Sequence, residues 1–155
     1  MNDDTQWLSP REQHAWRAFI RLNQKLTARL GSELQTQSKL SGPDFAILVA
    51  LTDDSAGRLR FQELAKAIDF EQSRLSHQIA RMIKRGLVAR EECAEDGRGA
   101  FVTITDQGRE AIEAAAPKHV AAVRRLVLDA IAPEDLDALG AISARIIKHL
   151  DETAP

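Results

Sequence analysis

With 155 residues, of which 44% are hydrophobic and 28% charged, the chain is long enough for one buried core and too apolar for a disordered protein. Its apolar runs all fall short of the roughly 20 residues that cross a bilayer, and the acidic start MNDDTQW is unlike a signal peptide. The one cysteine, Cys93, excludes an internal disulfide, so we expect a cytoplasmic protein with no membrane segment.

The charges are unevenly distributed along the chain. The net charge is −2, yet the segment from Arg58 to Arg90 holds eight basic and only three acidic residues. The rest of the chain therefore carries the acidic excess. Such asymmetry suits a protein that presents one positive face to phosphates, although a solvated charged surface would give the same count.

The first predicted helix covers residues 9–31. Ser9 is suited to the N-cap, Pro10 to the first turn and Glu12 to a capping box, and together they mark a helix start. We expect the helix to end at Gly31. Its wide apolar side indicates either core packing or contact with a second copy of the chain. That side carries Trp16, Phe19, Ile20, Leu26 and Leu30.

Two short helices and a strand are predicted next. The stretch SGPD (41–44) repeats the helix-start pattern, and the helix that follows it should be largely buried. A turn at 53–57 leads into a short strand at 58–60, and a third helix follows at 61–68. Because only two residues join this helix to the next one, the pair has the layout of a helix-turn-helix.

An amphipathic helix and a hairpin are predicted from Glu71 to Thr105. The apolar stripe of the helix comprises Leu75, Ile79, Met82 and Ile83. The rest of its surface comprises Arg74, His77, Gln78, Arg81, Lys84 and Arg85. Gly86 ends the helix, and residues 87–90 pair with 101–105 around a tip at 94–99. A basic helix and a basic-tipped hairpin indicate a winged helix-turn-helix, whose helix enters the DNA major groove while its tip reaches the backbone or minor groove.

Two further helices are predicted after the hairpin. Thr105 is suited to cap the first of them, which we expect to run to Ile131. Pro117 lies inside this run and predicts a kink or a break. Pro133 opens the last helix, which runs to Leu150 with a regular apolar stripe.

These elements predict a mainly α fold with a small β-hairpin wing, in a single domain that covers residues 1–155. Residues 41–105 would form a winged helix-turn-helix DNA-binding lobe. The helices from both termini, at 9–31 and 106–150, would pack together as a dimerisation region.

Five stretches of the chain carry a resemblance to a known family. They are LSGPDFAILVAL (40–51), FQELAKAI (61–68), SRLSHQIARMIKRGLVAR (73–90), DGRG (96–99) and VTITDQGRE (102–110). In this order they resemble the multiple-antibiotic-resistance regulator family, called MarR, over roughly residues 9–150. The resemblance implies a homodimeric winged-helix transcription factor, commonly a repressor. Such proteins bind palindromic double-stranded DNA operators and are often released by small aromatic ligands or by oxidants.

The resemblance also implies which residues contact DNA. The positions that meet base edges and nearby phosphates are occupied by Ser73, Arg74, Ser76 and His77. Arg81 lies where an arginine contacts the backbone, and Asp96 would orient Arg98 toward the minor groove. From the residues alone, we expect one phosphate contact among Arg81, Lys84 and Arg85 and at least one side chain of the three without a contact.

Two positions depart from the family pattern. Ala80 stands where an aspartate is frequent, so Arg81 would lack its usual partner. Arg60 replaces the small hydroxyl residue that often caps the third helix. Both departures concern the detail of the DNA contacts and leave the fold prediction unchanged.

A pocket for a small aromatic effector is predicted at the junction of the dimer region and the reading lobe, where the family often keeps one. Its candidate lining residues are Trp16, Phe19, Asn23 and Phe45. Aromatic residues at helical spacing are also what a plain core contains. Cys93 is expected to be passive and not an oxidant sensor, because nearby acidic residues disfavour a thiolate.

The sequence contains no recognised enzymatic motif. It lacks a phosphate-binding glycine loop, a metal-binding His pair and a nucleophile elbow, and its four histidines are scattered. We therefore expect a protein without catalytic activity, cofactor or metal. Two rival functions stay open: a winged-helix protein–protein interaction module that does not read DNA, and a small hydrolase.

Overall fold

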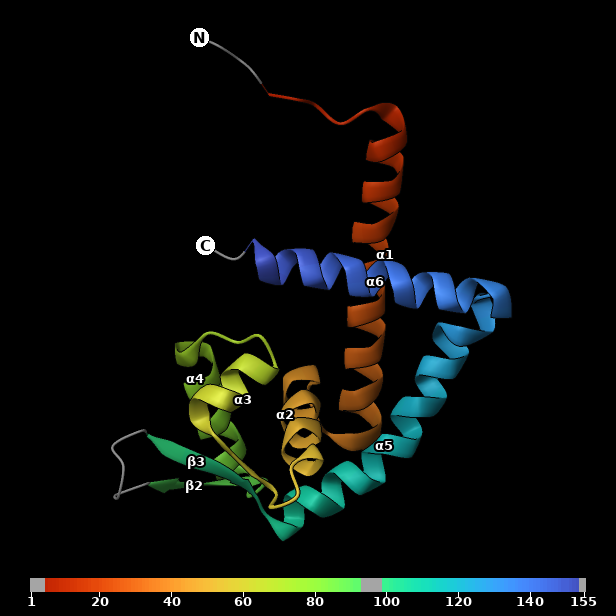
Figure 1. The fold of residues 1–155 in the computed structure, drawn as a ribbon. Helices are drawn as coiled ribbons and strands as arrows, with labels where there is room; N and C mark the ends of the chain where they lie inside the picture. Colours follow the sequence, from red (N-terminus) through yellow and green to blue (C-terminus); the bar gives the residue numbers. More distant parts are fainter. Residues whose placement is uncertain (1–4, 93–98, 154–155) are drawn as a thin grey trace. The chain divides into compact units, whose positions relative to one another are not determined.

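The computed structural model of the chain describes residues 5–92 and 99–153. The predicted fold class is confirmed, because helices dominate and the only strands among the described residues form one small antiparallel sheet. In chain order the elements are α1 (Pro10–Ser38), α2 (Gly42–Asp53), β1 (Arg58–Arg60), α3 (Phe61–Ala67), α4 (Gln72–Lys84), β2 (Val88–Glu92), β3 (Ala100–Ile104), α5 (Asp106–Leu126), a short 3₁₀ helix (Leu128–Ala130) and α6 (Pro133–Glu152) (Figure 1).

The chain divides into two compact units, Met1–His119 and Val120–Pro155. The first unit contains the three strands and the helices from α1 to α4, and the second contains α6. The single domain expected for residues 1–155 stays a prediction. None of the helices in the described residues is long and apolar enough to cross a membrane.

Helix α1 begins as predicted and ends later than predicted. The Ser9 hydroxyl accepts from the Glu12 N–H (3.3 Å), and the Glu12 carboxylate accepts from the Ser9 N–H (2.8 Å). Hydrogen bonds to the Glu12 carboxylate from the Ser9 side chain and from the Ser9 backbone N–H hold the pKa of Glu12 below its usual value. The predicted end at Gly31 is wrong, because a helical glycine costs only about 1 kcal/mol and continuation of the helix buries Leu34. The helix ends instead before Lys39, whose φ is 55°.

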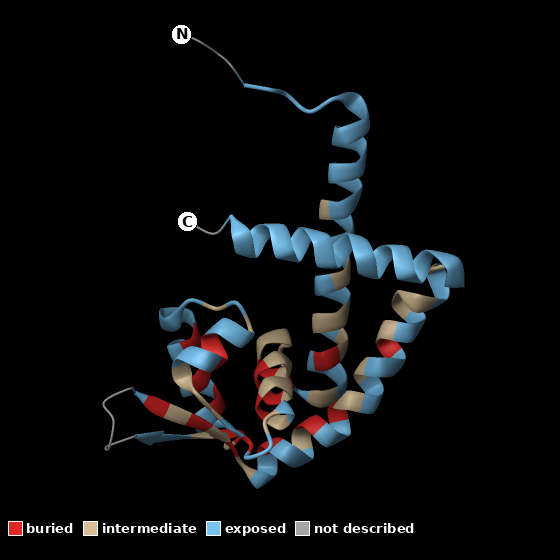
Figure 2. Ribbon diagram, viewed as in Figure 1, coloured by how far each residue is buried: buried red, intermediate tan, exposed pale blue. Residues whose placement is uncertain are grey.

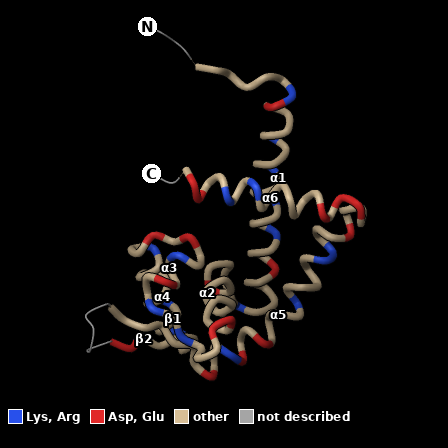
Figure 3. The backbone as a smooth tube through the Cα atoms, viewed as in Figure 1, with Lys and Arg blue, Asp and Glu red and all other residues tan. Residues whose placement is uncertain are grey.

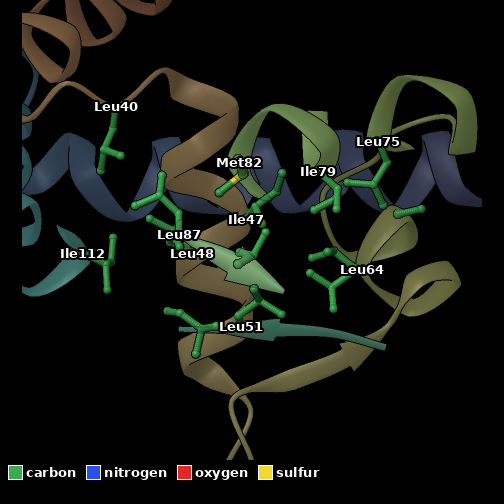
Figure 4. Close-up of a cluster of buried hydrophobic side chains, with 14 of the residues drawn as sticks. Leu40, Ile47, Leu48, Leu51, Leu64, Leu75, Ile79, Met82, Leu87 and Ile112 are labelled. Atoms are coloured by element: carbon green, nitrogen blue, oxygen red, sulfur yellow. The ribbon is translucent and has the colours of Figure 1, made fainter. Parts of the chain in front are cut away.

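The hydrophobic core of the first unit lies between α2, α3, α4 and the sheet (Figures 2 and 4). Its innermost side chains include Ile47, Leu48, Leu51, Leu64, Leu75, Ile79, Met82 and Val102. Helix α2 enters this core from the predicted capping box, in which Ser41 and Asp44 exchange hydrogen bonds. The core therefore fixes the orientation of α4, which supplies one face to it and leaves the other face outside.

The three strands form an antiparallel sheet in the order β1-β3-β2. The predicted hairpin and the predicted addition of 58–60 are confirmed, with Val88 opposite Ile104 and Arg60 opposite Phe101. The inward side chains of β3 are buried, and Phe101 is only partly buried. The expected tip at 94–99 lies outside the described residues apart from Gly99.

Two glycines permit the joint between α4, β2 and α5. Gly86, with φ 75°, ends α4 as predicted, because this left-handed conformation strains other residues. Gly108 is required by close approach, since a Cβ there would lie 2.1 Å from the Leu87 carbonyl oxygen. The predicted cap is confirmed: the Thr105 hydroxyl accepts from the Gly108 N–H (3.0 Å) and donates to the Gly86 carbonyl (2.6 Å).

Helix α5 continues through Pro117 and ends at Leu126, so it is not broken at the proline, and the predicted end at Ile131 is wrong. The kink, the other alternative at Pro117, stays a prediction. A proline inside a helix removes one hydrogen bond and frees the carbonyl four residues earlier. Pro117 and Glu113 are both exposed, so water can reach that carbonyl. In the second unit, α6 starts at Pro133 as predicted and contains no buried residue.

Candidate nucleic-acid interface

Helix α4 presents a polar outer face and a buried apolar face. Leu75, Ile79 and Met82 are fully buried and form the inner face of the helix. The predicted DNA-contacting residues of this helix are all exposed, namely Ser73, Arg74, Ser76, His77, Arg81 and Lys84. The helix carries no acidic residue of its own (Figure 3). An exposed, positively charged helix face of this kind suits an approach to phosphates.

Two residues of α4 lie on the opposite side from the one predicted. Ile83 was expected in the apolar stripe and is 40% exposed, because it lies about 100° around the helix from Met82. Gln78 was expected on the surface and is only 6% exposed. The buried stripe therefore contains one polar side chain, and burial of an amide requires hydrogen-bond partners.

Asp44 is the centre of a hydrogen-bond network that supplies those partners. The residue is 1% exposed, and its Oδ1 accepts from Gln78 Nε2 (2.6 Å). Its Oδ2 accepts from the Ser41 N–H (2.8 Å) and from Arg85 Nη1 (2.6 Å). Arg85 also donates through Nη2 to the carbonyl of Lys39, which follows α1. The carboxylate thus ties α4 to the start of α2 and the end of α1.

The network reaches the surface at Arg81. Nη2 of Arg81 donates to Oε1 of Gln78, so Gln78 bridges a buried carboxylate and an exposed guanidinium. Ala80 leaves Arg81 without the aspartate that is its usual partner in the family, and Gln78, one turn earlier in the same helix, accepts from Arg81 instead. The missed signal was the position of Gln78, which shares helical spacing with Leu75 and Met82.

Arg74, at the start of α4, rests on an aromatic ring. Its Cζ lies 3.8 Å from the ring centroid of Phe70, in the joint between α3 and α4. A guanidinium held over a ring keeps its edge free for hydrogen bonds. The ring contact therefore restricts the orientation of the Arg74 side chain, which stays exposed.

Part of the positive charge counted for the segment 58–90 is paired with acidic residues in the folded chain. Arg58 pairs with Glu91 (3.6 Å), and Arg90 pairs with Glu92 (3.3 Å). Both acids lie just beyond the counted segment. Arg58 and Arg60 also lie over the Phe101 ring, at 4.5 and 4.7 Å from its centroid. The basic surface is therefore concentrated on α4 and not spread over the sheet.

The start of α3 lacks a hydroxyl cap, as the departure at Arg60 implies. The Arg60 N–H donates to the Glu63 carboxylate (3.2 Å), which stabilises the helix start without a hydroxyl cap. Three predicted residues, Cys93, Asp96 and Arg98, lie outside the described residues. The wing pair and the passive role of Cys93 therefore stay predictions.

The four candidate pocket residues come from two helices. On α1, the rings of Trp16 and Phe19 stack at 6.1 Å and are 53% and 46% exposed, while Asn23 donates to the Phe19 carbonyl (3.2 Å). On α2, Phe45 packs instead against His119, with 4.4 Å between ring centroids. Nδ1 of His119 is buried and has no hydrogen-bond partner among the described residues. Sequence reasoning had no signal for this contact, and the pocket stays a prediction.

The chain is similar to known transcriptional regulators. A model of the MarR family matches residues 38–99. The transcriptional regulator HosA of Escherichia coli is 34% identical over 103 residues, which span 66% of this chain and 73% of that protein. The structure of AbsC, a MarR family transcriptional regulator from Streptomyces coelicolor, is 43% identical with a TM-score of 0.90, and the match covers 96% of this chain and 100% of that one. Sco3205, a MarR family regulator of the same organism solved in complex with DNA, is 40% identical with a TM-score of 0.90, covering 96% and 93%.

Proposed function

The chain belongs to the MarR family of DNA-binding transcriptional regulators, and on this premise we propose that it acts as a homodimeric repressor of a pseudo-palindromic operator. The observation that carries the proposal is the outer face of α4, which exposes Arg74, Arg81 and Lys84 together with the smaller Ser73 and Ser76. The protein binds DNA without transforming it, in the cytoplasm where the chromosome lies.

In this proposal α4 enters the major groove, where Ser73, Arg74, Ser76 and His77 face base edges and phosphates. Arg81 and Lys84 contact the backbone, and the Asp96–Arg98 pair of the wing reaches the minor groove. Two copies of α4 occupy successive major grooves, with centres about 34 Å apart. Affinity falls steeply with salt, because each phosphate contact releases counterions.

A second copy of the chain is the expected partner of α6. This helix exposes a continuous set of large apolar side chains, namely Leu136, Leu139, Ile142, Ile146, Ile147 and Leu150. Apart from Ile147, they recur every three or four residues, which is the spacing of helices that pack against each other. In the first unit, α1 likewise exposes Trp16, Phe19 and Leu22. Water contact with so many large side chains is unfavourable, so covering them favours association.

A small aromatic effector releases the operator in this proposal. Trp16, Phe19 and Asn23 remain its candidate contacts on α1, and Phe45 is its candidate contact on α2. The buried, unpartnered Nδ1 of His119 beside Phe45 offers a hydrogen bond to a polar substituent on such a ligand. The effector acts by preferring one spacing of the two α4 helices, since equal affinity for both spacings would shift nothing.

Selection of bound sites from random DNA tests the DNA-reading proposal. We expect an inverted repeat with half-sites about one helical turn apart, roughly 10 base pairs. Arg74→Ala should weaken binding to the selected site, while Arg29→Ala, at another exposed arginine, on α1, should leave it unchanged. Absence of any selected sequence would instead favour an interaction module that does not read DNA.

Light scattering on a sizing column tests the homodimer. We expect twice the mass of one chain, and we expect Ile146→Asp to shift the protein toward the monomer by placing a charge in the apolar face. Ala141→Asp is the matched control, because Ala141 is exposed on the opposite side of α6. A wild-type monomer, or equal effects of the two substitutions, would contradict the proposed interface.

A further inference from the structure

We propose that Gln78 is a positioning residue for DNA binding, which holds the Arg81 guanidinium ready for a backbone phosphate, and that Asp44 in turn fixes Gln78. The proposal rests on the DNA-reading function proposed for α4. It concerns a buried side chain that makes no contact with DNA and acts only through its neighbour.

The chemistry of Asp44 determines which way the Gln78 amide points. An ionised carboxylate only accepts hydrogen bonds, so the 2.6 Å contact with Asp44 Oδ1 must come from the NH₂ group of Gln78. The carbonyl oxygen of the same amide then points the other way. That oxygen meets Nη2 of Arg81, which only donates. The three groups therefore form one polarised chain with a single allowed direction.

The buried end of this chain of hydrogen bonds is shielded from water and held by several partners. Asp44 is 1% exposed and Gln78 is 6% exposed, so water does not compete for their hydrogen bonds. Asp44 is held from two further directions by the Ser41 N–H (2.8 Å) and by Arg85 (2.6 Å). A fixed carboxylate fixes the amide, and the fixed amide leaves Arg81 with one guanidinium nitrogen anchored.

The outer end of this chain of hydrogen bonds is Arg81, which is exposed and keeps N–H donors that are not used by Gln78. Arg81 has five N–H donors, and the bond to Gln78 uses one nitrogen of the fork. Ordering a long, flexible side chain at the moment of binding weakens affinity, by about two- to tenfold for one side chain. An Arg81 that is ordered beforehand avoids this loss. Lys84, one turn further along, takes no part in this network within the described residues, so it provides a comparison on the same helix face.

The alternative is that Gln78 merely satisfies Asp44 and keeps the fold intact. Double-mutant cycles distinguish the two, because a residue that acts through Arg81 loses its effect when Arg81 is absent. The test variant is Gln78→Met, which keeps the volume and removes both hydrogen bonds. Binding is measured by fluorescence anisotropy on a duplex carrying the site that the wild type selects, between about 50 and 200 mM salt.

We expect Gln78→Met to weaken binding by about fivefold and to make the salt slope less steep by up to about one unit, as expected for one phosphate contact. In an Arg81→Ala background the same substitution should change affinity by less than about twofold. In a Lys84→Ala background it should keep its full effect. Equal weakening of the wild type and of Arg81→Ala, or no weakening of the wild type, would overturn the proposal.

A second measurement on the wild type decides the question if Gln78→Met does not fold. Nitrogen-15 NMR of the free protein should show hindered rotation of the Arg81 guanidinium, with the signal assigned by its loss in Arg81→Lys. A freely rotating Arg81 would overturn the proposal even if the protein reads DNA well. Absence of selective binding by the wild type would overturn the DNA-reading function itself, and this inference with it.

Discussion

Replacement of Asp44 by asparagine changes one oxygen of a buried carboxylate into a donor. Ser41, Arg85 and Gln78 all donate to this carboxylate in the native structure. The new NH₂ must therefore face donors, either the pair Ser41 and Arg85 or, in a second arrangement, Gln78. The second arrangement loses less, because Gln78 can turn its own amide over. The NH₂ group of Gln78 then faces Arg81, and two donors cannot bond to each other. Arg81 is exposed, so water can replace its lost partner. The hydrogen bond that is lost is therefore the one that positions Arg81.

The cost of Asp44→Asn follows from the bonds that remain. The bond from Ser41 becomes neutral, and the bond from Arg85 loses the charge on its acceptor, at about 1 kcal/mol each. The Arg85 side chain is 41% exposed, so solvent reduces its share. We expect a loss of about 2 kcal/mol in the free energy of unfolding, or about 4–8 °C in Tm for a chain of this length. DNA affinity should fall as it does for Gln78→Met.

Urea unfolding followed by far-ultraviolet circular dichroism measures this loss. The protein concentration must be the same for each variant, because association makes apparent stability depend on it. Asp53→Asn is the matched control on the same helix, since Asp53 is exposed and should change stability by less than about 0.5 kcal/mol. If Asp44→Asn were as stable as this control, the energetic importance assigned to the network would be refuted.

Three further predictions test other parts of the fold. Gly108→Ala should destabilise the chain by about 3 kcal/mol or more in urea unfolding, because a Cβ there would lie 2.1 Å from a backbone carbonyl; wild-type stability would contradict that geometry. Gly31→Ala should raise Tm by about 2–4 °C in a thermal melt, because Gly31 lies inside α1 with no neighbour within 4 Å of a Cβ. Ser9→Ala should raise the pKa of Glu12 toward its usual value in an NMR titration. Because the pKa of Glu12 is lower in the folded chain than in the unfolded chain, Glu12 stabilises the fold above its usual pKa, and this contribution is lost as the pH falls through the lowered, folded pKa. An unchanged Glu12 pKa in Ser9→Ala would show that the Ser9 cap does not cause the shift.

The sequence was a good guide wherever structure depends on near neighbours. The capping boxes at Ser9 and Ser41 each join residues three positions apart, so they are readable as short patterns. The buried stripe of α4 follows from helical periodicity, and Gly86 follows from the need for a positive φ. These local rules locate the candidate interface, because they decide which side of α4 faces the core.

The sequence was a poor guide wherever two distant segments meet. Asp44 and Gln78 are 34 residues apart, and the fold alone brings them to hydrogen-bond distance. The reason for Gly108 lies in a carbonyl of the preceding hairpin, and the contact of Phe45 with His119 joins α2 to α5. Charge counted along the chain likewise overstated the basic surface, because it left out acids that adjoin the segment in space.

The shared carboxylate of Asp44 has a consequence for how this protein can change over generations. Its partners Gln78 and Arg85 are donors, so loss of the acid strands two groups at once, and loss of either donor leaves buried charge less well compensated. Arg81 depends on the same amide. Positions 44, 78, 81 and 85 should therefore be inherited as a set, and related chains that lack one member should differ at the others as well.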